Sequence, residues 1–240
     1  MFPHLKENNV RTGFIEQSGF DLLRGLATDV WLRLFLEMAF EFGWRKRELL
    51  DLRVRQADLT TGTIRLDVGT TKNDAGREVT MTNAIRELVR SASIKKRPDD
   101  YLFTRENGTR VKDFRKAWQS LCIKAGLGRM VCRDCTKTVI GKKCECGRKK
   151  LKYAGLILHD FRRSAARELR RAGVAESTIM DIGGWKTRSM FKRYAIKDTR
   201  DIKAAIEKRE QARVEISHDY GHDSPFDGLG TAKKTTSGIN

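Results

Sequence analysis

The sequence has little that would mark an exported or membrane-spanning protein. Its first residues, MFPHLKENNVRTG, lack the apolar core of a secretory signal. Its most apolar stretch, residues 30–42, is too short for a bilayer and carries Arg33, Glu37 and Glu41. These absences predict a cytoplasmic protein without membrane contact, in a reducing compartment where its five cysteines form no disulfides.

Acidic residues are scarce relative to basic ones. The 240 residues include 49 Lys and Arg but only 31 Asp and Glu, for a net charge of +18 and a pI near 10.0. A surplus of this size suits a polyanion, and nucleic acid is the commonest one. No basic amphipathic helix with an aromatic apolar face is present, which argues against an acidic membrane lipid as the partner. An ordinary basic surface is the remaining alternative.

What the sequence does contain is mainly helical periodicity, with no internal repeat. Apolar residues at helical spacing predict helices over residues 21–26, 30–42, 47–52, 85–92, 111–122, 160–172, 176–182, 188–194 and 198–214. Alternating Ile, Leu, Val and Thr predict strands over 63–68 and 77–81, with turn residues between them. The prediction is one mostly helical α+β domain with a small antiparallel sheet.

The boundaries of this domain follow from composition. We expect a lead-in over residues 1–13, the domain over 14–216 and a disordered tail over 217–240, which is rich in Gly, Ser, Thr and Asp. Within the domain, Cys122 shares a helical face with apolar residues and is expected in the core. The last helix is expected to bury Ile202, Ala205 and Ile206.

Four short segments carry residues that suit phosphate chemistry. They are GWRKRELLDL from Gly43, TTKNDAGREV from Thr70, HDFRRSAA from His159 and GGWKTRSMFKRY from Gly183. The residues of interest in them are Arg45, Lys72, His159, Arg162, Trp185 and Tyr194. Each one alone is ordinary, since a single arginine on a helix is usually a solvated charge. Together, the cations can hold a phosphodiester while the tyrosine attacks it.

In this order the four segments resemble the motifs of the tyrosine recombinases, the phage-integrase-like site-specific recombinases, over about residues 14–196. GWRKREL is similar to the family's Gly-x-Arg-x-x-Glu-Leu box, TTKNDAGREV to its lysine hairpin, and HDFR to its His-x-x-Arg motif. Tyr194 stands nine residues after Trp185, the spacing of the last box. The family usually has histidine where this chain has Trp185; an indole N–H still donates a hydrogen bond but accepts no proton.

The resemblance implies DNA strand cleavage through a phosphotyrosine. Arg45 and Arg162 would hold the non-bridging oxygens, because guanidinium groups bond such oxygens bidentately and stay charged. An unperturbed tyrosine has a pKa of about 10 and needs a base or a cationic pocket to attack. His159 is the candidate base, with a purely phosphate-orienting role as the alternative. Tyr194 would form a 3′-phosphotyrosyl bond and release a 5′-hydroxyl.

The remaining motif residues would assist this step. Lys72 would protonate the leaving 5′ oxygen, and Trp185 would donate a neutral hydrogen bond to the phosphate. Glu48 is interpreted as a carboxylate that positions an arginine; ordinary helix capping or pairing is its alternative. A second 5′-hydroxyl reverses the reaction, so catalysis requires no cofactor, ATP or metal.

Residues 129–152 interrupt the helical pattern with four cysteines. Cys132, Cys135, Cys144 and Cys146 are a typical ligand set for a structural Zn²⁺, which predicts an inserted zinc-ribbon-like loop. The second pair has one intervening residue rather than two, so reduced, unliganded cysteines are the alternative. Many lysines surround the loop, and we expect a DNA-backbone contact, with a purely folding role as the other possibility.

The expected partner is double-stranded DNA, bound by a homo-oligomer. The resemblance implies a tetramer on DNA, in which the helix after residue 198 docks on a neighbour. Family members usually have a core-binding domain before the catalytic one, whereas about a dozen residues precede it here, as in a fragment or a minimal member. Two alternative functions are a degenerate, non-catalytic DNA-binding protein and a type IB topoisomerase-like enzyme.

Overall fold

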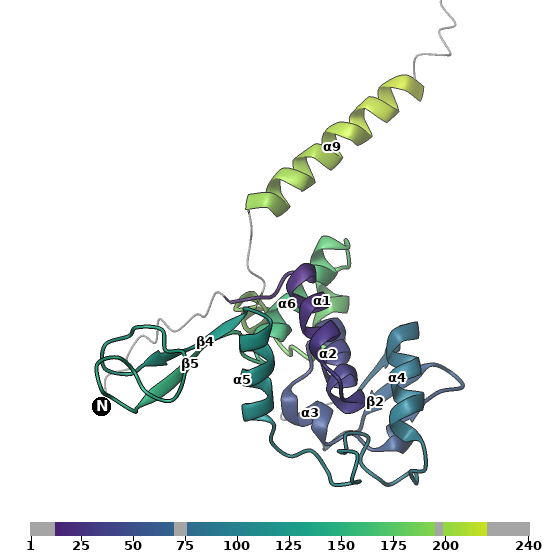
Figure 1. Cartoon of the computed structure of the whole chain (residues 1–240). Coiled ribbons are helices and arrows are strands. Elements are labelled where there is room, and N and C mark those ends of the chain that lie inside the picture. The colour runs from purple at the N-terminus through teal and green to yellow at the C-terminus, as the bar shows by residue number, and fades with distance from the viewer. Residues whose placement is uncertain (1–12, 70–75, 195–198, 220–240) are drawn as a thin grey trace, which may run out of the picture. The chain divides into compact units, whose positions relative to one another are not determined.

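The computed structural model describes residues 13–69, 76–194 and 199–219 (Figure 1). They belong to two compact units that divide between Ile196 and Lys197. The helices of the first unit are α1 (Gln17–Leu26), α2 (Val30–Phe42), α3 (Lys46–Leu50), α4 (Asn83–Ser93), α5 (Arg115–Lys124), α6 (Asp160–Arg171), α7 (Glu176–Gly183) and α8 (Arg188–Lys192). Among the described residues no helix is both long and apolar enough to cross a membrane.

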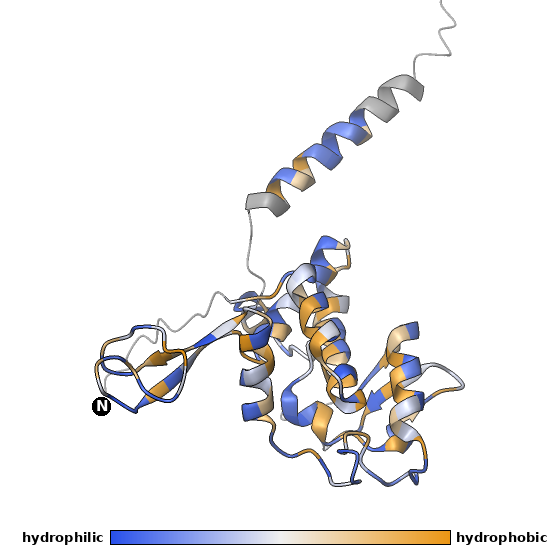
Figure 2. Ribbon diagram, in the orientation of Figure 1, coloured by the Kyte–Doolittle hydropathy of each residue, from blue (hydrophilic) through white to orange (hydrophobic). Residues whose placement is uncertain are grey.

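Helix α2 is the centre of the first unit and packs against α1, α4 and α6. Its ends match the sequence prediction, and its residues are apolar on nearly every side (Figure 2). Even Glu37 is buried; burial raises the pKa of its carboxyl, although Arg24 lies 3.5 Å away. Gly43 ends the helix in the left-handed conformation at φ +63°, which favours glycine.

Aromatic side chains hold the helices around α2 together. Phe20 of α1 stacks on Phe40 with ring centroids 4.1 Å apart, and Trp118 of α5 meets Phe161 of α6 edge to face at 5.7 Å. Such pairs add about 1 kcal/mol each beyond the area they bury. Cys122 is fully buried in this core, as its helical position predicts.

Three strands follow the 3-10 helix η1 (Val54–Gln56) and form an antiparallel sheet: β1 (Ala57–Asp58), β2 (Thr63–Leu66) and β3 (Arg77–Thr80). The pairing sets Leu66 opposite Arg77 at the end of the hairpin next to the connecting loop. The two predicted strands are confirmed, with shorter ends. Lys72 belongs to residues 70–75, which lie outside the described residues.

A second hairpin was not predicted from the sequence. Residues 129–152 were expected as a loop, but β4 (Gly128–Cys132) and β5 (Leu151–Gly155) pair antiparallel at its base. We call Gly128–Gly155 the cysteine arm; it extends away from the end of α5 (Figure 1). Each strand has only five residues, and neighbouring apolar residues such as Met130, Val131 and Cys132 replace the strict apolar–polar alternation that marks a strand in a sequence.

The second unit is represented by α9 (Thr199–Asp219). A helix here was predicted, but the burial assigned to it is wrong: Ile202 and Ile206 are 58% and 57% exposed, and Ala205 is also exposed. The helix is mostly hydrophilic (Figure 2), so it has no apolar stripe wide enough to pack by itself. The expected tail is also wrong at its start, because residues 217–219 are helical; residues 220–240 lie outside the described part of the chain.

Candidate active site

The corner between α2 and α3 positions Arg45. A Cβ at Gly43 would lie 3.0 Å from the Cβ of Ala165 and 3.3 Å from the Cα of Arg162, so only glycine lets α2 and α6 approach this closely. Trp44 is buried and donates from Nε1 to the carbonyl of Ile182 at 2.7 Å. Arg45 follows at the N-cap of α3. The two residues before it contact α6 and α7, which lie far along the sequence, and these contacts fix its position.

Glu48 is the anchor of the arginines at this corner. Its buried carboxylate accepts hydrogen bonds from the backbone N–H of Arg45 at 2.9 Å and from Arg45 Nη1 at 2.7 Å. Arg77 Nη2 lies 2.9 Å from the same carboxylate. Burial would raise the pKa of Glu48, but these hydrogen bonds and positive charges outweigh it and lower the pKa. The carboxylate therefore stays ionised and holds both guanidinium groups.

Helix α6 supplies the histidine and the second arginine. Arg162 is 2% exposed, and its Nη1 donates to the carbonyls of Gly43 at 2.7 Å and Gly183 at 2.6 Å. Burial, followed by the charge of Arg45, lowers the pKa of Arg162 to about 10, so the group is still cationic at neutral pH. His159 directly precedes the helix.

Tyr194, which follows α8 near the C-terminal end of the first unit, lies next to His159. Its hydroxyl lies 3.0 Å from His159 Nε2, within the reach needed for proton transfer. Trp185 packs against Tyr194 and Phe191, and the Arg162 guanidinium carbon lies 4.0 Å from the Trp185 ring centroid. The indole N–H of Trp185 is buried and has no hydrogen-bond partner among the described residues.

Arg45, His159 and Arg162 line one pocket, next to Trp185 and Tyr194. A cavity of about 850 Å³ is lined by Arg45, His159 and Arg162, and the basic residues Lys46, Arg47 and Arg115 line it as well. Burial, then the charges of Arg162 and Arg163, lower the pKa of His159 below its ordinary value. The structure thus brings together five of the six residues singled out from the sequence: Arg45, His159, Arg162, Trp185 and Tyr194. The sixth, Lys72, lies outside the described residues.

Sequence reasoning missed Arg77 as a member of this site. Its side chain is 8% exposed, and besides bonding Glu48 it donates to the carbonyl of Gly183 at 2.9 Å. A Cβ at Gly184 would lie 2.4 Å from the Arg77 guanidinium, so this glycine makes room for it. Arg77 thereby ties the sheet to the segment that carries Trp185. Its position five residues after Lys72, at the start of the predicted strand, was the available signal.

The four cysteines of the arm also gather at one point. The sulfur atoms of Cys132, Cys135, Cys144 and Cys146 all lie within 4.8 Å of one another, so the cluster is able to hold a metal ion. Two turns present them, and each closes with a left-handed residue: Thr136 at φ +60° and Gly147 at φ +77°. The Thr136 N–H donates to Cys132 O, and the Gly147 N–H to Cys144 O.

Comparison with known proteins agrees with this arrangement. Recombinase Cre of Escherichia phage P1 is 28% identical over 195 residues, which cover 75% of this chain and 54% of Cre; the chain spans about half the length of that curated relative. Among solved structures, the XerA recombinase has a TM-score of 0.61 at 19% identity, over 82% of this chain and 65% of that one. The Tn1549 transposon integrase, in complex with a circular intermediate DNA, has a TM-score of 0.58 at 14% identity, over 85% and 68%.

The fold therefore resembles that of recombinases and integrases, and a family model matches the sequence of the same region. The phage integrase family model matches residues 20–200, a range that contains all six motif residues and the cysteine arm. This chain belongs to the phage integrase family.

Proposed function

We propose that this chain is the catalytic part, over residues 14–216, of a site-specific DNA recombinase that cuts and rejoins strands through a 3′-phosphotyrosine. The observation that carries the proposal is the Tyr194 hydroxyl 3.0 Å from His159 Nε2, beside a buried arginine. A module that only binds DNA has no use for a phenol bonded to a histidine in this way.

In the proposed first step the Tyr194 oxygen attacks the phosphorus of one strand. The phenolic proton passes to His159 Nε2 as the new O–P bond forms. The bond from phosphorus to the 5′ oxygen breaks, and that oxygen leaves with a proton from Lys72. A depressed histidine pKa supports this role, because a neutral imidazole is available as the acceptor at pH 7.

The arginines would supply most of the transition-state stabilisation. Charge accumulates on the non-bridging oxygens, and fixed guanidinium groups stabilise it without reorganising. Glu48 and the carbonyls of Gly43 and Gly183 already orient Arg45 and Arg162. The unpartnered indole N–H of Trp185 is suited to one more phosphate oxygen. A second 5′-hydroxyl then attacks the phosphotyrosine and restores both the DNA strand and the tyrosine.

The proposed partner is duplex DNA, bound by a homo-oligomer that is a tetramer when active. The net charge of +18 and the basic residues around the pocket support DNA as the substrate. The solved complex of the Tn1549 integrase contains DNA, which supports the same partner here.

A nicked suicide oligonucleotide tests the proposal. After cleavage, the short 5′-hydroxyl fragment diffuses away, so the enzyme stays trapped on the 3′ phosphate. We expect a covalent protein–DNA band on a denaturing gel and a free 5′-hydroxyl on the released fragment. A degenerate binding protein gives no such band. A type IB topoisomerase-like enzyme forms the same adduct but also relaxes supercoiled plasmid that contains no partner site.

The depressed pKa of His159 predicts how cleavage depends on pH. The protonated ring cannot accept the phenolic proton, and its pKa lies below the ordinary 6.5. The single-turnover cleavage rate should therefore be flat between about pH 7 and 8 and fall only as the pH drops through that lowered pKa. His159→Gln should slow cleavage by about 100-fold at pH 7.

The same variant provides the control for this assignment. Glutamine keeps a hydrogen-bonding group near Tyr194 but does not titrate, so His159→Gln should lose the acidic limb of the profile. A wild-type rate that declines as the pH rises from 6.5 to 8 would instead mean that the imidazolium is the active form.

For the cysteine arm we propose a structural Zn²⁺ bound by four thiolates. Tetrahedral Zn–S bonds of about 2.3 Å place sulfur atoms about 3.8 Å apart. The pair Cys132 and Cys146 lies at 3.7 Å and the pair Cys135 and Cys144 at 3.3 Å, which fits this geometry after small shifts. Apart from the cysteines, the buried residues of the arm include only Val131 and Val139, too little apolar surface for the arm to fold alone.

Metal analysis should find one zinc per chain, lost when Cys132→Ser and Cys135→Ser are combined. Loss of zinc should unfold the arm, because apparent zinc-binding energies of about 10 kcal/mol or more drive the folding of such sites. Cys122→Ala is the matched control, since Cys122 is buried in the helical core and should leave zinc content at one. Retention of zinc by the double variant would contradict the assignment of ligands.

A further inference from the structure

The cysteine arm is rooted next to the candidate active site. At its base, Tyr153 donates to the carbonyl of Leu156 at 2.9 Å, and Trp118 Nε1 donates to the same carbonyl at 3.1 Å. Leu156 N–H also bonds to Leu127 O, which closes the base of the hairpin. His159 follows only three residues later, and Tyr153 lines the same pocket as His159. The position of the arm is therefore coupled to the pocket through buried contacts.

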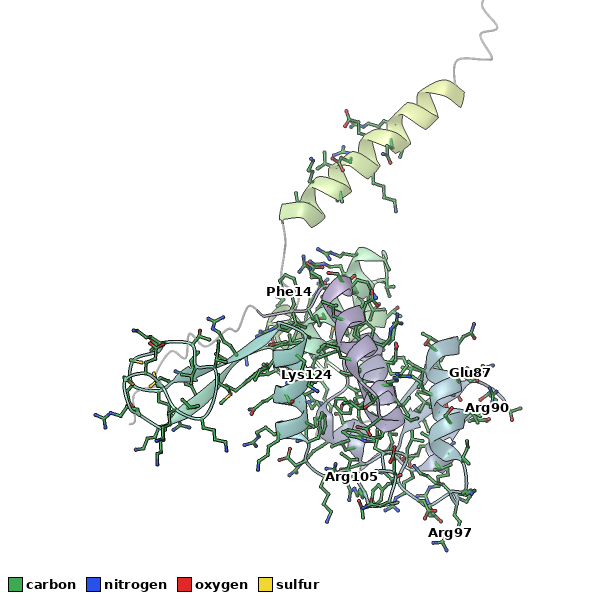
Figure 3. The ribbon with its side chains drawn as sticks, in the orientation of Figure 1. Phe14, Glu87, Arg90, Arg97, Arg105 and Lys124 are labelled. Atoms are coloured by element: carbon green, nitrogen blue, oxygen red, sulfur yellow. The ribbon has the colours of Figure 1, made fainter. Side chains whose placement is uncertain are left out.

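The arm carries an excess of unpaired positive charge. It has nine Lys and Arg residues against two Asp and Glu, and all nine are exposed. Four thiolates around a divalent ion would remove two of the seven excess charges and leave the arm strongly positive. Figure 3 shows nitrogen-tipped side chains that point away from its ribbon. Within the described residues, no acidic group lies within ion-pair distance of any of the nine.

In the rest of the first unit, a number of cations have carboxylate partners. Arg77 pairs with Glu48 at 2.9 Å, Lys46 with Asp113 at 2.9 Å, and Arg167 with Glu16 at 3.2 Å. The body thus balances much of its positive charge internally, whereas the arm does not. Repulsion among nearby like charges opposes the folded arm, and an external polyanion would relieve that repulsion.

The strand register places four of these cations on one face. Val131 pairs with Lys152 and Arg129 with Ala154, so Arg129 and Lys152 lie on the same side of the hairpin. The ladder continues as the Arg133 N–H donates to Lys150 O, which adds Arg133 and Lys150 to that side. The opposite face carries Met130, Cys132, Leu151 and Tyr153, all buried or half-buried.

We propose that this basic face, defined by Arg129, Arg133, Lys150 and Lys152, binds the sugar–phosphate backbone of duplex DNA beside the cleaved strand. The inference rests on the proposed function for the choice of duplex DNA. Residues two apart on a strand are spaced by about 6.8 Å, so the face presents a row of charges, not a single point. A strand of five residues extends about 17 Å from the base of the arm, which is the length of about five base pairs of a duplex. The metal site holds the row rigid, and the contact reads no sequence.

Two variants of equal charge test the proposal. The arm variant combines Arg133→Gln, Lys150→Gln and Lys152→Gln. The control combines Arg90→Gln, Arg97→Gln and Arg105→Gln, exposed residues that lie away from the arm (Figure 3). The full chain is titrated into a fluorescent duplex of mixed sequence at salt concentrations from about 50 to 200 mM. Zinc content equal to that of the wild type verifies that the arm is folded.

The dependence of log K on log salt reports the number of phosphate contacts. Each lost contact lowers its slope by about 0.9, so the arm variant should lower it by about 2.7 and the control should leave it unchanged. Lys150→Arg with Lys152→Arg should keep the wild-type slope. Equal loss in both variants would mean that only total charge matters, and an unchanged slope in the arm variant would remove the proposed contact.

A protein partner is the other kind of macromolecule that an arm can bind. Ile140, near the metal turns, is fully exposed and belongs to no cation row. If Ile140→Ser impaired assembly while the arm variant bound DNA normally, the arm would be a protein contact and the proposal would be wrong. Because binding is measured on intact DNA, it is independent of cleavage: a missing covalent adduct with a changed slope would reject the proposed function alone.

Discussion

Tyr194→Phe is expected to abolish the covalent protein–DNA adduct while duplex binding persists. Only the phenolic oxygen is removed, and the ring that packs beside Trp185 and Arg162 remains. Without that oxygen no O–P bond can form, so the adduct should fall by at least about 10⁴-fold, below detection on a denaturing gel. Binding to the same oligonucleotide, measured by gel shift, should be unchanged because the cationic pocket is intact.

Tyr153→Phe is the matched control for this experiment. Tyr153 lines the same pocket as Arg45 and His159, and its hydroxyl bonds to a backbone carbonyl instead of a histidine. This variant should still form the adduct. If the adduct survived Tyr194→Phe and disappeared in Tyr153→Phe, the nucleophile would be Tyr153. Peptide mapping of the wild-type adduct identifies the modified tyrosine directly.

The helical part of this fold was predictable because its signals are local. Residues 30–42 are apolar on nearly every side and are followed by a glycine, which predicts both ends of α2. The predicted strands over residues 63–68 and 77–81 also formed, with their ends shortened by one or two residues. In each case the deciding information lies within about a dozen consecutive residues.

The features that sequence reasoning missed depend on partners far along the chain. The sequence indicates only that Arg77 belongs to a strand. Folding then brings Glu48 and the Gly183 carbonyl to its guanidinium group. The β4–β5 hairpin pairs two five-residue segments on either side of a cysteine cluster, and neither segment alternates regularly between apolar and polar residues. The burial predicted for Ile202 was wrong because α9 has no apolar stripe wide enough to define a buried face.

For the proposed site, the sequence predicts which residues take part but not the contacts that hold them. Motif spacing selected Arg45, His159, Arg162 and Tyr194. Folding brings the first three to one pocket and places the Tyr194 hydroxyl 3.0 Å from His159. What spacing does not predict is how each is held: two glycine carbonyls accept hydrogen bonds from Arg162. Those carbonyls come from segments 140 residues apart, at Gly43 and Gly183. The hydrogen-bond network of the site is therefore a product of the tertiary fold.

This network makes Arg162→Lys the second large predicted effect. A lysine keeps the charge, but its single ammonium cannot bond both carbonyls and also present a fork to the phosphate. We expect the single-turnover cleavage rate with saturating enzyme to fall by about 10³-fold, the loss typical when one charge-stabilising donor is removed. Affinity for the uncleaved duplex should change little, because the net charge of the pocket is conserved.

Arg163→Lys separates this chemical effect from a loss of stability. Arg163 is the next residue of α6 and is also buried, but it does not line the pocket, and its nearest carboxylate, on Asp160, is 3.9 Å away. Both variants should lower the melting temperature, because both remove a buried guanidinium, whereas only Arg162→Lys should slow cleavage. Similar rates in the two variants would show that the buried arginine acts through folding alone, and the phosphate would then depend on Arg45 and the lysine hairpin for its stabilisation.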